Sequence, residues 1–157
     1  MLTKSDLVVR DMDLFKRMSG SSVGISMAFQ NDNGRKLFEA DTLSNRKRLE
    51  ALRKLHEEGI KTYTLICPVM PFITNVGELI SQVEPYSDTI WIYALSFDRY
   101  EDRNWQNMRQ ILQEHYPDMV KKYKEIAFNS DHAYWTRLRS ELQLLQQQTL
   151  SELRIEV

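Results

Sequence analysis

Polar side chains stand at the ends of apolar segments in this sequence, and these are the groups best placed to do chemistry. Lys4, Ser26 and Ser96 lie at or near such ends. Serine hydroxyls act as nucleophiles when a neighbouring base activates them. The four apolar segments are Leu2–Lys4, Val23–Phe29, Thr62–Val69 and Thr89–Leu95. In parallel β/α sheets and barrels, functional groups collect at the carboxyl ends of the strands, so the sequence predicts a polar ring there.

Each of these residues also has a simpler structural interpretation. A lysine near a terminus, such as Lys4, is usually solvated, and a serine inside an apolar strand, such as Ser26, is usually a hydrogen-bonded core residue. Glu39 could form an ordinary ion pair with Arg46 or Arg48, because all three follow the second apolar segment. From the residues alone, the sequence contains no complete catalytic constellation.

Several conventional sites are absent from the sequence. Cys67 is the one cysteine, and a single thiolate cannot by itself hold zinc or an iron–sulfur cluster. The three histidines are scattered, and no HxxxH or Cys/His cluster occurs. Neither a phosphate-binding glycine loop nor a GxSxG nucleophile elbow is present. The sequence therefore predicts no metal site.

The apolar segments alternate with helical patterns, which predicts a parallel α/β fold. Three of the segments are almost continuously apolar, as is typical of strands buried on both faces. The clearest helix is 45–58, with Ser44 as its N-cap and Gly59 at the C′ position. We expect a single domain, 1–157, with a β/α core over 1–100. A helical extension over 101–157 ends in a possible last strand at Leu153–Val157.

Composition excludes some classes of protein. The chain has 157 residues, enough for one domain with a sizeable core, and a formal net charge of −1. Such a charge gives no general attraction for nucleic acid. No apolar stretch approaches the ~20 residues that cross a bilayer, and charges interrupt the N-terminal segment where a signal peptide would be apolar. We therefore expect no membrane partner and a cytoplasmic location.

Two long segments together resemble one protein family. They are LTKSDLVVRDMDLF at 2–15 and RLEALRKLHEEGIKTYTLICPVMP at 48–71, and HYPDMVKKYKEIAFNSDHAYW at 115–135 adds to the match. These segments are similar to the latter half of radical S-adenosylmethionine (SAM) proteins of the spore photoproduct lyase-like family. Each motif is weak alone, but the combination covers nearly the whole chain.

The resemblance implies a partial (β/α) barrel with about four parallel core strands. In that family, SAM binds beside a [4Fe–4S] cluster and is cleaved to a 5′-deoxyadenosyl radical. Lys4 and Ser26 would bind the SAM carboxylate as a charge-assisted clamp. Glu39 and Arg48 would lie on the ribose side, and Ser96 would replace a polar residue that follows the last core strand.

The sequence also departs from the family pattern. The family holds its cluster with a CxxxCxxC motif upstream of the TKS strand, and this chain contains no such motif. The stretch after Glu39 reads ADTLS and lacks the family's two prolines, and Phe72 in PVMPF stands where glycine is usual. We therefore expect a carboxyl-terminal fragment of a radical SAM enzyme of the lyase class that is inactive alone. SAM binding would be weak or absent, and a cluster would form only with an upstream segment.

Two alternatives stay open at this stage. The chain could be a non-catalytic interaction module that pairs through an open first strand, either as a homodimer or with the missing half of the barrel. It could also be an unrelated small hydrolase that uses the polar ring, although no nucleophile–base pairing supports this. The sequence does not indicate a substrate.

Overall fold

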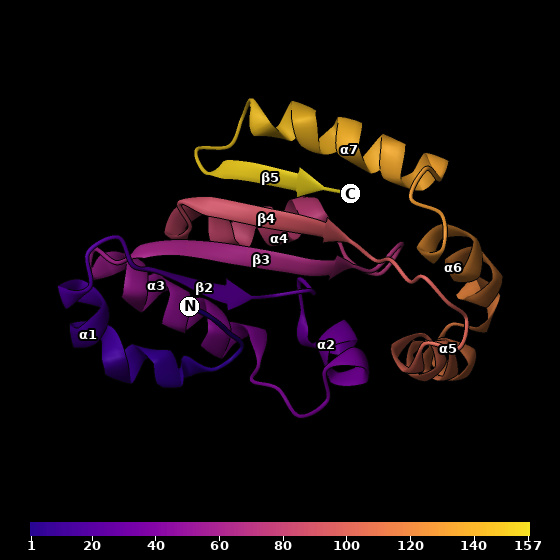
Figure 1. Cartoon of the computed structure of the whole chain (residues 1–157), viewed down its shortest axis with the longest axis horizontal. Coiled ribbons are helices and arrows are strands. Elements are labelled where there is room, and N and C mark those ends of the chain that lie inside the picture. The colour runs from indigo at the N-terminus through magenta and orange to yellow at the C-terminus, as the bar shows by residue number, and fades with distance from the viewer.

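Five parallel strands form a single sheet in the computed structural model, which describes all of residues 1–157 (Figure 1). The strands follow one another across the sheet in chain order, β1-β2-β3-β4-β5, and every neighbouring pair is parallel. They are β1 (Leu2–Thr3), β2 (Ser22–Ser26), β3 (Lys61–Val69), β4 (Thr89–Ala94) and β5 (Glu152–Glu156). The prediction of a parallel α/β fold is confirmed, and the expected last strand belongs to the sheet.

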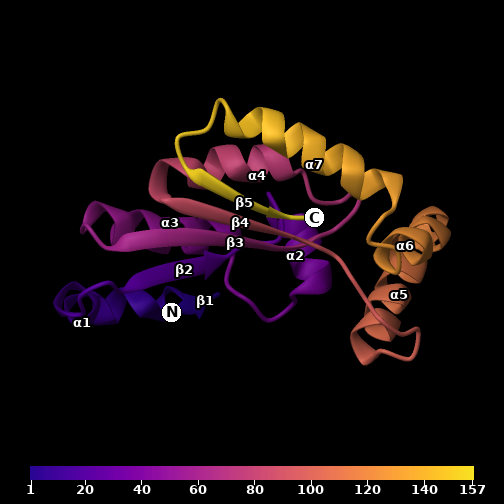
Figure 2. The same cartoon turned by 45° about the horizontal axis from the view of Figure 1, so that its top comes forward.

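Helices connect the strands and cover one face of the sheet. Figures 1 and 2 show α3 and α4 on that face, whereas α5 and α6 lie beyond the carboxyl ends of the strands. The α-helices are α1 (Met12–Arg17), α2 (Asp32–Phe38), α3 (Asn45–Glu57), α4 (Val76–Val83), α5 (Arg103–His115), α6 (Val120–Ala127) and α7 (Ala133–Gln146). The 3-10 helices are η1 (Asp6–Asp11), η2 (Glu84–Tyr86) and η3 (Pro117–Met119). None of the helices is both long and apolar enough to span a bilayer.

The expectation that the strands are buried on both faces holds for Val23–Phe29, where every residue is buried, but is wrong for β3 and β4. Along β3, Thr62, Thr64 and Ile66 are fully buried, whereas the residues between them, Tyr63 and Leu65, are only half-buried. This alternation arises because successive side chains of a strand point to opposite faces and the helices cover one face only. The other face, which we call the open face, is turned towards the viewer in Figure 1.

Helix α3 forms where the sequence predicts it. The Ser44 hydroxyl accepts a hydrogen bond from the backbone N–H of Lys47 (3.4 Å), which satisfies one free amide of the first turn. Leu52 and Leu55 are fully buried against the sheet. Gly59 follows the helix with φ = +73°, a conformation that glycine adopts without the steric cost of a Cβ atom.

Two features were not expected from the sequence pattern. Helix α2 is one; its N-cap is Asn31, whose side chain accepts a hydrogen bond from the N–H of Asn33 (3.0 Å). The other is the backbone of Phe72, with φ = +64°, in the left-handed region that favours glycine. The PVMPF turn thus keeps a glycine-like conformation with an aromatic residue in it.

The carboxyl-terminal helices are tied to the rest of the molecule by buried aromatic side chains. The Tyr123 hydroxyl on α6 donates to the backbone carbonyl of Pro71, after β3 (2.5 Å). The Trp135 indole on α7 donates to the carbonyl of Ile126 on α6 (3.1 Å). Both rings are buried and belong to the main hydrophobic core. The helical extension therefore packs on the β/α core through shared apolar surface.

Candidate functional site

An ion-pair network joins Lys4, Glu39 and Arg48. The Lys4 ammonium contacts one carboxylate oxygen of Glu39, and an Arg48 guanidinium nitrogen contacts the other at 2.8 Å. Lys4 directly follows β1, Glu39 follows α2, and Arg48 lies in the first turn of α3. Three segments that are distant in sequence thus meet at the carboxyl ends of neighbouring parallel strands, where the polar ring was expected.

Arg48 is the most buried member of the network. Its side chain is 1% exposed, and a second guanidinium nitrogen donates to the backbone carbonyl of Ser26 at the end of β2 (3.0 Å). The Nε atom of Arg48 is buried and has no hydrogen-bond partner within the chain. A buried charge of this kind is stable only while its partners remain in place.

Ser26 completes the cluster on the neighbouring strand. Lys4 lies one residue beyond the pair Thr3–Ile25, so it lies level with Ser26. The Ser26 hydroxyl makes no hydrogen bond within the chain, and the residue is only 5% exposed. A hydroxyl is therefore available next to the one network cation that is also partly exposed, because the Lys4 side chain is 41% exposed.

Cys67 lies on β3 near the same end of the sheet. Desolvation by burial raises the pKa of its thiol, and the positive charge of Lys4 opposes this effect. The thiol is free and half-buried. Because the raised pKa keeps the thiol protonated at neutral pH, Cys67 is a weak nucleophile in this environment.

Helix α2 and the loop after it hold Glu39 in position. The Thr42 hydroxyl donates to the Glu39 backbone carbonyl (2.6 Å). Asp32 at the start of α2 accepts from the backbone N–H of Asn45 (2.9 Å) and from the Arg35 side chain (2.7 Å), which connects α2 to α3. These two hydrogen bonds lower the pKa of the Asp32 carboxyl group. The sequence analysis missed Thr42 and Asp32, although an Asn-Asp pair is a typical helix start.

Ser96 does not belong to this cluster. It is exposed after β4 and lines a separate cavity of about 450 Å³ with residues of α7 and β5, including Arg139 and Ile155. Of the five residues predicted to bind the cofactor, the structure thus brings four together (Lys4, Ser26, Glu39 and Arg48) and leaves Ser96 apart.

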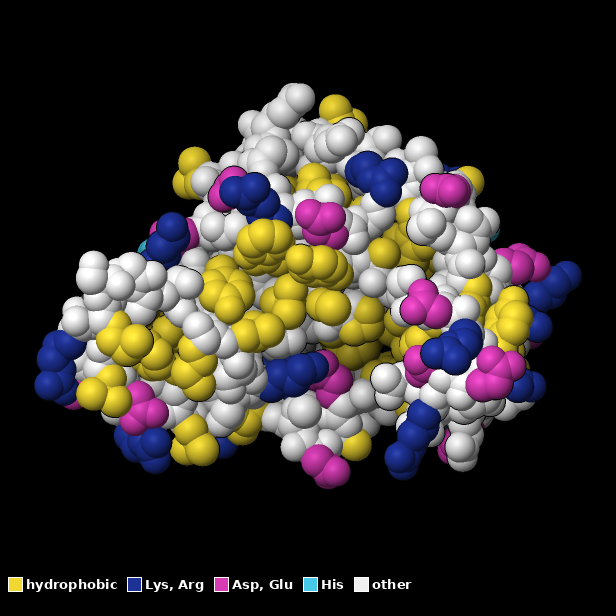
Figure 3. All heavy atoms as spheres, in the orientation of Figure 1, with side chains coloured by type: hydrophobic (Ala, Val, Ile, Leu, Met, Phe, Trp, Pro, Cys, Tyr) yellow, Lys and Arg dark blue, Asp and Glu magenta, His cyan; other side chains and the backbone are white.

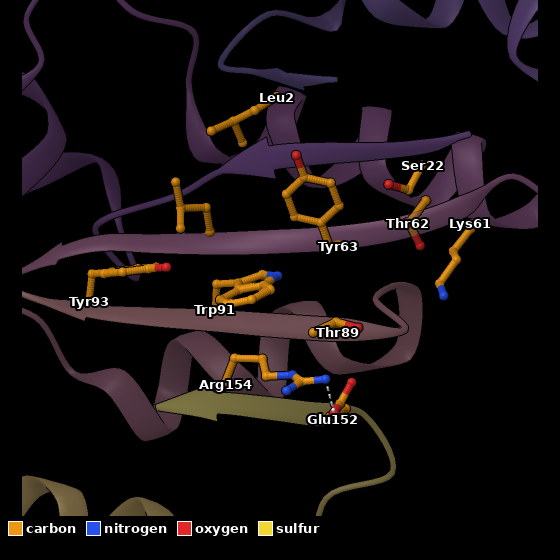
Figure 4. A pocket seen from close by; sticks show the side chains of 11 residues that line it. Leu2, Ser22, Lys61, Thr62, Tyr63, Thr89, Trp91, Tyr93, Glu152 and Arg154 are labelled. Carbon is orange, nitrogen blue, oxygen red and sulfur yellow. Dashed lines mark ion pairs between the residues drawn. The ribbon is translucent and has the colours of Figure 1, made fainter. Parts of the chain in front are cut away.

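The open face of the sheet carries a shallow hollow of about 490 Å³ (Figure 4). Its floor is aromatic, with Tyr63 on β3 and the stacked rings of Trp91 and Tyr93 on β4 (centroids 6.3 Å apart). On β5 the Arg154 guanidinium lies 5.7 Å from the Trp91 ring centroid and pairs with Glu152 (2.6 Å). Figure 3 shows apolar side chains gathered across the middle of this face.

The network can attract one additional anion. It contains two cations, Lys4 and Arg48, and one carboxylate, Glu39, so its formal charge is +1. Lys4 has three N–H donors and can contact a second carboxylate while it keeps Glu39. The unengaged Ser26 hydroxyl can donate to the same ligand.

Comparisons with known proteins find relatives whose function is not described. An uncharacterised protein of Methanocaldococcus jannaschii is 37% identical over 117 residues, which cover 71% of this chain and 45% of that protein. An uncharacterised protein of Mycobacterium tuberculosis is 26% identical over 133 residues, which cover 80% of this chain and 38% of that protein. The chain spans less than half the length of these relatives. No family model and no solved structure matches it.

The residues of this chain do not fit an iron–sulfur cluster by themselves. Three thiolates of a CxxxCxxC motif would be needed, and Cys67 is the one cysteine. No group of three or more His, Cys, Asp or Glu side chains is placed to hold a metal ion.

Proposed function

We propose that this chain is the carboxyl-terminal part of a radical SAM protein that resembles the spore photoproduct lyase-like family. The observation that carries the proposal is the convergence of Lys4, Ser26, Glu39 and Arg48 at the carboxyl ends of β1 and β2. The family resemblance assigns SAM contacts to these four positions, and three of them join in one ion-pair network with a free hydroxyl beside it.

The sheet topology supports a partial (β/α) barrel as the framework. Five parallel strands in sequential order, with helices on one face, correspond to part of a barrel wall. The open face would then line the barrel interior, and its aromatic floor would face the substrate. The same topology also occurs in open sheets, so barrel closure is part of the proposal.

Each residue has a defined role in this proposal. Lys4 binds the carboxylate of SAM, and the Ser26 hydroxyl donates a second hydrogen bond to it. Glu39 holds the Lys4 ammonium in position, and Arg48 holds Glu39 and the end of β2. A [4Fe–4S] cluster, held by cysteines outside this chain, would supply the electron for reductive cleavage of the bound SAM.

Cluster ligands would come from polypeptide outside these 157 residues. Both relatives described above are more than twice as long as the segment they share with this chain. We propose that the remaining half of the barrel carries CxxxCxxC, either in one longer chain or in a partner chain. On its own, this chain would not cleave SAM.

Calorimetric titration with SAM tests the binding site. We expect weak binding of SAM by the wild-type chain. In Lys4→Ala the binding free energy should be less favourable by about 1.5–3 kcal/mol, the range for a hydrogen bond to a charged group. Lys16→Ala is the matched control, because Lys16 also pairs with a glutamate, Glu58, but lies on α1. Equal affinities for wild type and Lys4→Ala would contradict the proposal.

Anaerobic reconstitution with iron and sulfide tests the cluster assignment. We expect no stoichiometric cluster in this chain alone, and a [4Fe–4S] absorption spectrum once a CxxxCxxC half is joined to it or added. A brown protein with stoichiometric iron and sulfide from the 157 residues alone would overturn the assignment.

A second candidate is a non-catalytic module that pairs through β1. This strand is only two residues long, lies at the sheet edge and leaves one side of its backbone without a neighbouring strand. Leu2 is 46% exposed there. An edge of this kind can accept another strand. A strictly monomeric protein in analytical ultracentrifugation would exclude a homodimer through this edge.

A further inference from the structure

A cavity of about 470 Å³ lies between α7 and the turn that joins β3 to α4, and no member of the ion-pair network lines it. Figure 2 shows α4 and α7 next to each other. The volume falls within the range of small-ligand sites, about 300–1,000 Å³. Most of the lining is apolar, with Ile73 and Val76 on one side and Leu138, Leu142 and Leu145 of α7 on the other.

Glu141 is the one ionised side chain that lines this cavity. It forms no ion pair within the chain, whereas Glu50 and Glu57 on α3 each pair with a cation one turn away on the same helix. Burial raises the pKa of Tyr134, and the negative charge of Glu141 acts in the same direction, so the carboxylate lies near this phenol. An unpaired carboxylate at an apolar cavity favours a ligand that is cationic at one end and apolar along the rest.

The cavity also has an aromatic corner. The rings of Phe72 and Tyr134 line it, with centroids 5.2 Å apart and planes at 63°. Phe72 is 54% exposed although its φ of +64° is costly for a residue with a Cβ atom. Strained backbone of this kind is concentrated at ligand sites. Because burial of the ring does not offset the strain, a ligand that covers the ring gives this conformation a function.

The spacing along α7 defines the shape of the ligand. Tyr134, Leu138 and Glu141 are four and seven residues apart, so they lie on one face of the helix. Tyr134 and Glu141 are separated by about 10 Å along the helix axis. An elongated molecule can therefore contact the aromatic corner and the carboxylate at the same time.

We propose that this cavity binds a small primary amine with an apolar chain. The ammonium group lies at Glu141, and the chain packs against Leu138 and the corner formed by Phe72 and Tyr134. This inference rests on α7 and the turn before α4, and it does not depend on the proposed SAM site.

The first test compares hexylamine, hexanol and hexanoate by calorimetry at low ionic strength. The three probes share one chain and differ in the charge of the end group. Hexylamine should bind at least about threefold more tightly than hexanol, and hexanoate more weakly than hexanol. Added salt should reduce the advantage of hexylamine. Equal binding of the three probes, or no binding of hexylamine, overturns the proposal.

N-acetyl-lysine amide distinguishes a free amine from a protein side chain. It presents the same ammonium group on a lysine, as a partner protein would. We expect it to bind more weakly than hexylamine, because its amide groups do not match the apolar lining. If it binds more tightly, the occupant is a lysine of a partner protein, and the assignment to a small molecule is wrong.

The second test uses matched glutamate variants. Glu141→Gln should remove the preference for hexylamine over hexanol and leave the affinity for hexanol unchanged. Glu125→Gln removes the same charge from α6, where Glu125 is exposed and does not line the cavity. This control should keep the preference. If both variants lose it to the same extent, the cavity is not the binding site.

Phe72→Gly separates a ligand contact from a structural role. The variant should weaken binding of hexylamine and of hexanol about three- to tenfold, because both lose the apolar surface of the ring. Its free energy of unfolding should stay the same or rise, because glycine adopts a positive φ without steric cost. A less stable protein with unchanged affinity for both probes would show that Phe72 has only a structural role and would overturn its place in the site.

Discussion

Glu39 lies between two cations that differ in exposure. Its side chain is 9% exposed, that of Lys4 is 41% exposed and that of Arg48 is 1% exposed. Water screens the Glu39–Arg48 attraction less than the Glu39–Lys4 attraction, because Arg48 is buried and Lys4 is partly solvated. Lys4 remains partly solvated and is the member that can reach a ligand.

At the residue scale, Arg48→Met should strongly destabilise the protein. The variant removes one partner of a buried pair and leaves the Ser26 carbonyl without its donor. We expect a loss of about 3–5 kcal/mol in the free energy of unfolding. Urea denaturation followed by circular dichroism measures this value.

Arg53→Met is the control for that prediction. Arg53 lies on the same helix and also pairs with a glutamate, Glu57 (2.8 Å), but its side chain is 43% exposed. Its loss should cost less than about 1 kcal/mol. Similar losses for the two variants would mean that Arg48 is not buried as described.

At the scale of elements, the contact between β2 and β3 depends on a glycine. Gly24 on β2 pairs with Tyr63 on β3. The Tyr63 ring lies so close that a Cβ atom added to Gly24 would stand 2.1 Å from it. Glycine therefore lets the ring lie flat on the open face, where its hydroxyl donates to the Met1 carbonyl (3.0 Å).

Gly24→Ala should displace the Tyr63 ring and weaken the β1–β2–β3 end of the sheet. We expect a loss of about 1–3 kcal/mol in the free energy of unfolding, as for other overpacked sites. Gly77→Ala is the matched control, because no heavy atom lies within 3.4 Å of its added Cβ and the residue is helical. That variant should be neutral or gain up to about 1 kcal/mol. Thermal unfolding of both variants distinguishes these outcomes, and equal effects would contradict the packing described.

At the scale of the whole molecule, the two faces of the sheet differ. One face is covered by helices, and the other exposes a group of apolar side chains (Figure 3). Trp91 lies on this open face (Figure 4). A contiguous apolar surface of this kind is typical of an interface or a ligand site. The open face is therefore the surface on which further polypeptide or a substrate would lie in the proposed barrel.

Acrylamide quenching of tryptophan fluorescence tests this difference between the faces. Trp105 and Trp135 are 2% and 1% exposed, whereas Trp91 is only half-buried. We expect acrylamide to quench one fraction of the tryptophan fluorescence, that of Trp91. This fraction should be lost in Trp91→Phe, with little change in the free energy of unfolding. If the quenched fraction persists in Trp91→Phe, the open face is not the surface that solvent reaches.

Much of the fold could be predicted from the sequence because its signals are local. The bounds of α3 follow from a serine cap, spaced leucines and Gly59, and the alternation of apolar and helical segments predicts parallel strands. The single cysteine limits the metal chemistry of the chain wherever it lies in the fold. The family resemblance selected five residues as cofactor contacts, namely Lys4, Ser26, Glu39, Arg48 and Ser96, and four of them lie together.

Only the tertiary structure decided how those residues meet and which surface stays open. Glu39 pairs with both Lys4 and Arg48 because α2 and the loop after it pass over the ends of the strands, and no local pattern encodes that path. The open face arises because every helix that covers the sheet lies on the same side, which periodicity within one strand does not determine. Ser96 shares its position after a strand with the others, yet the sheet places it two strands beyond Ser26.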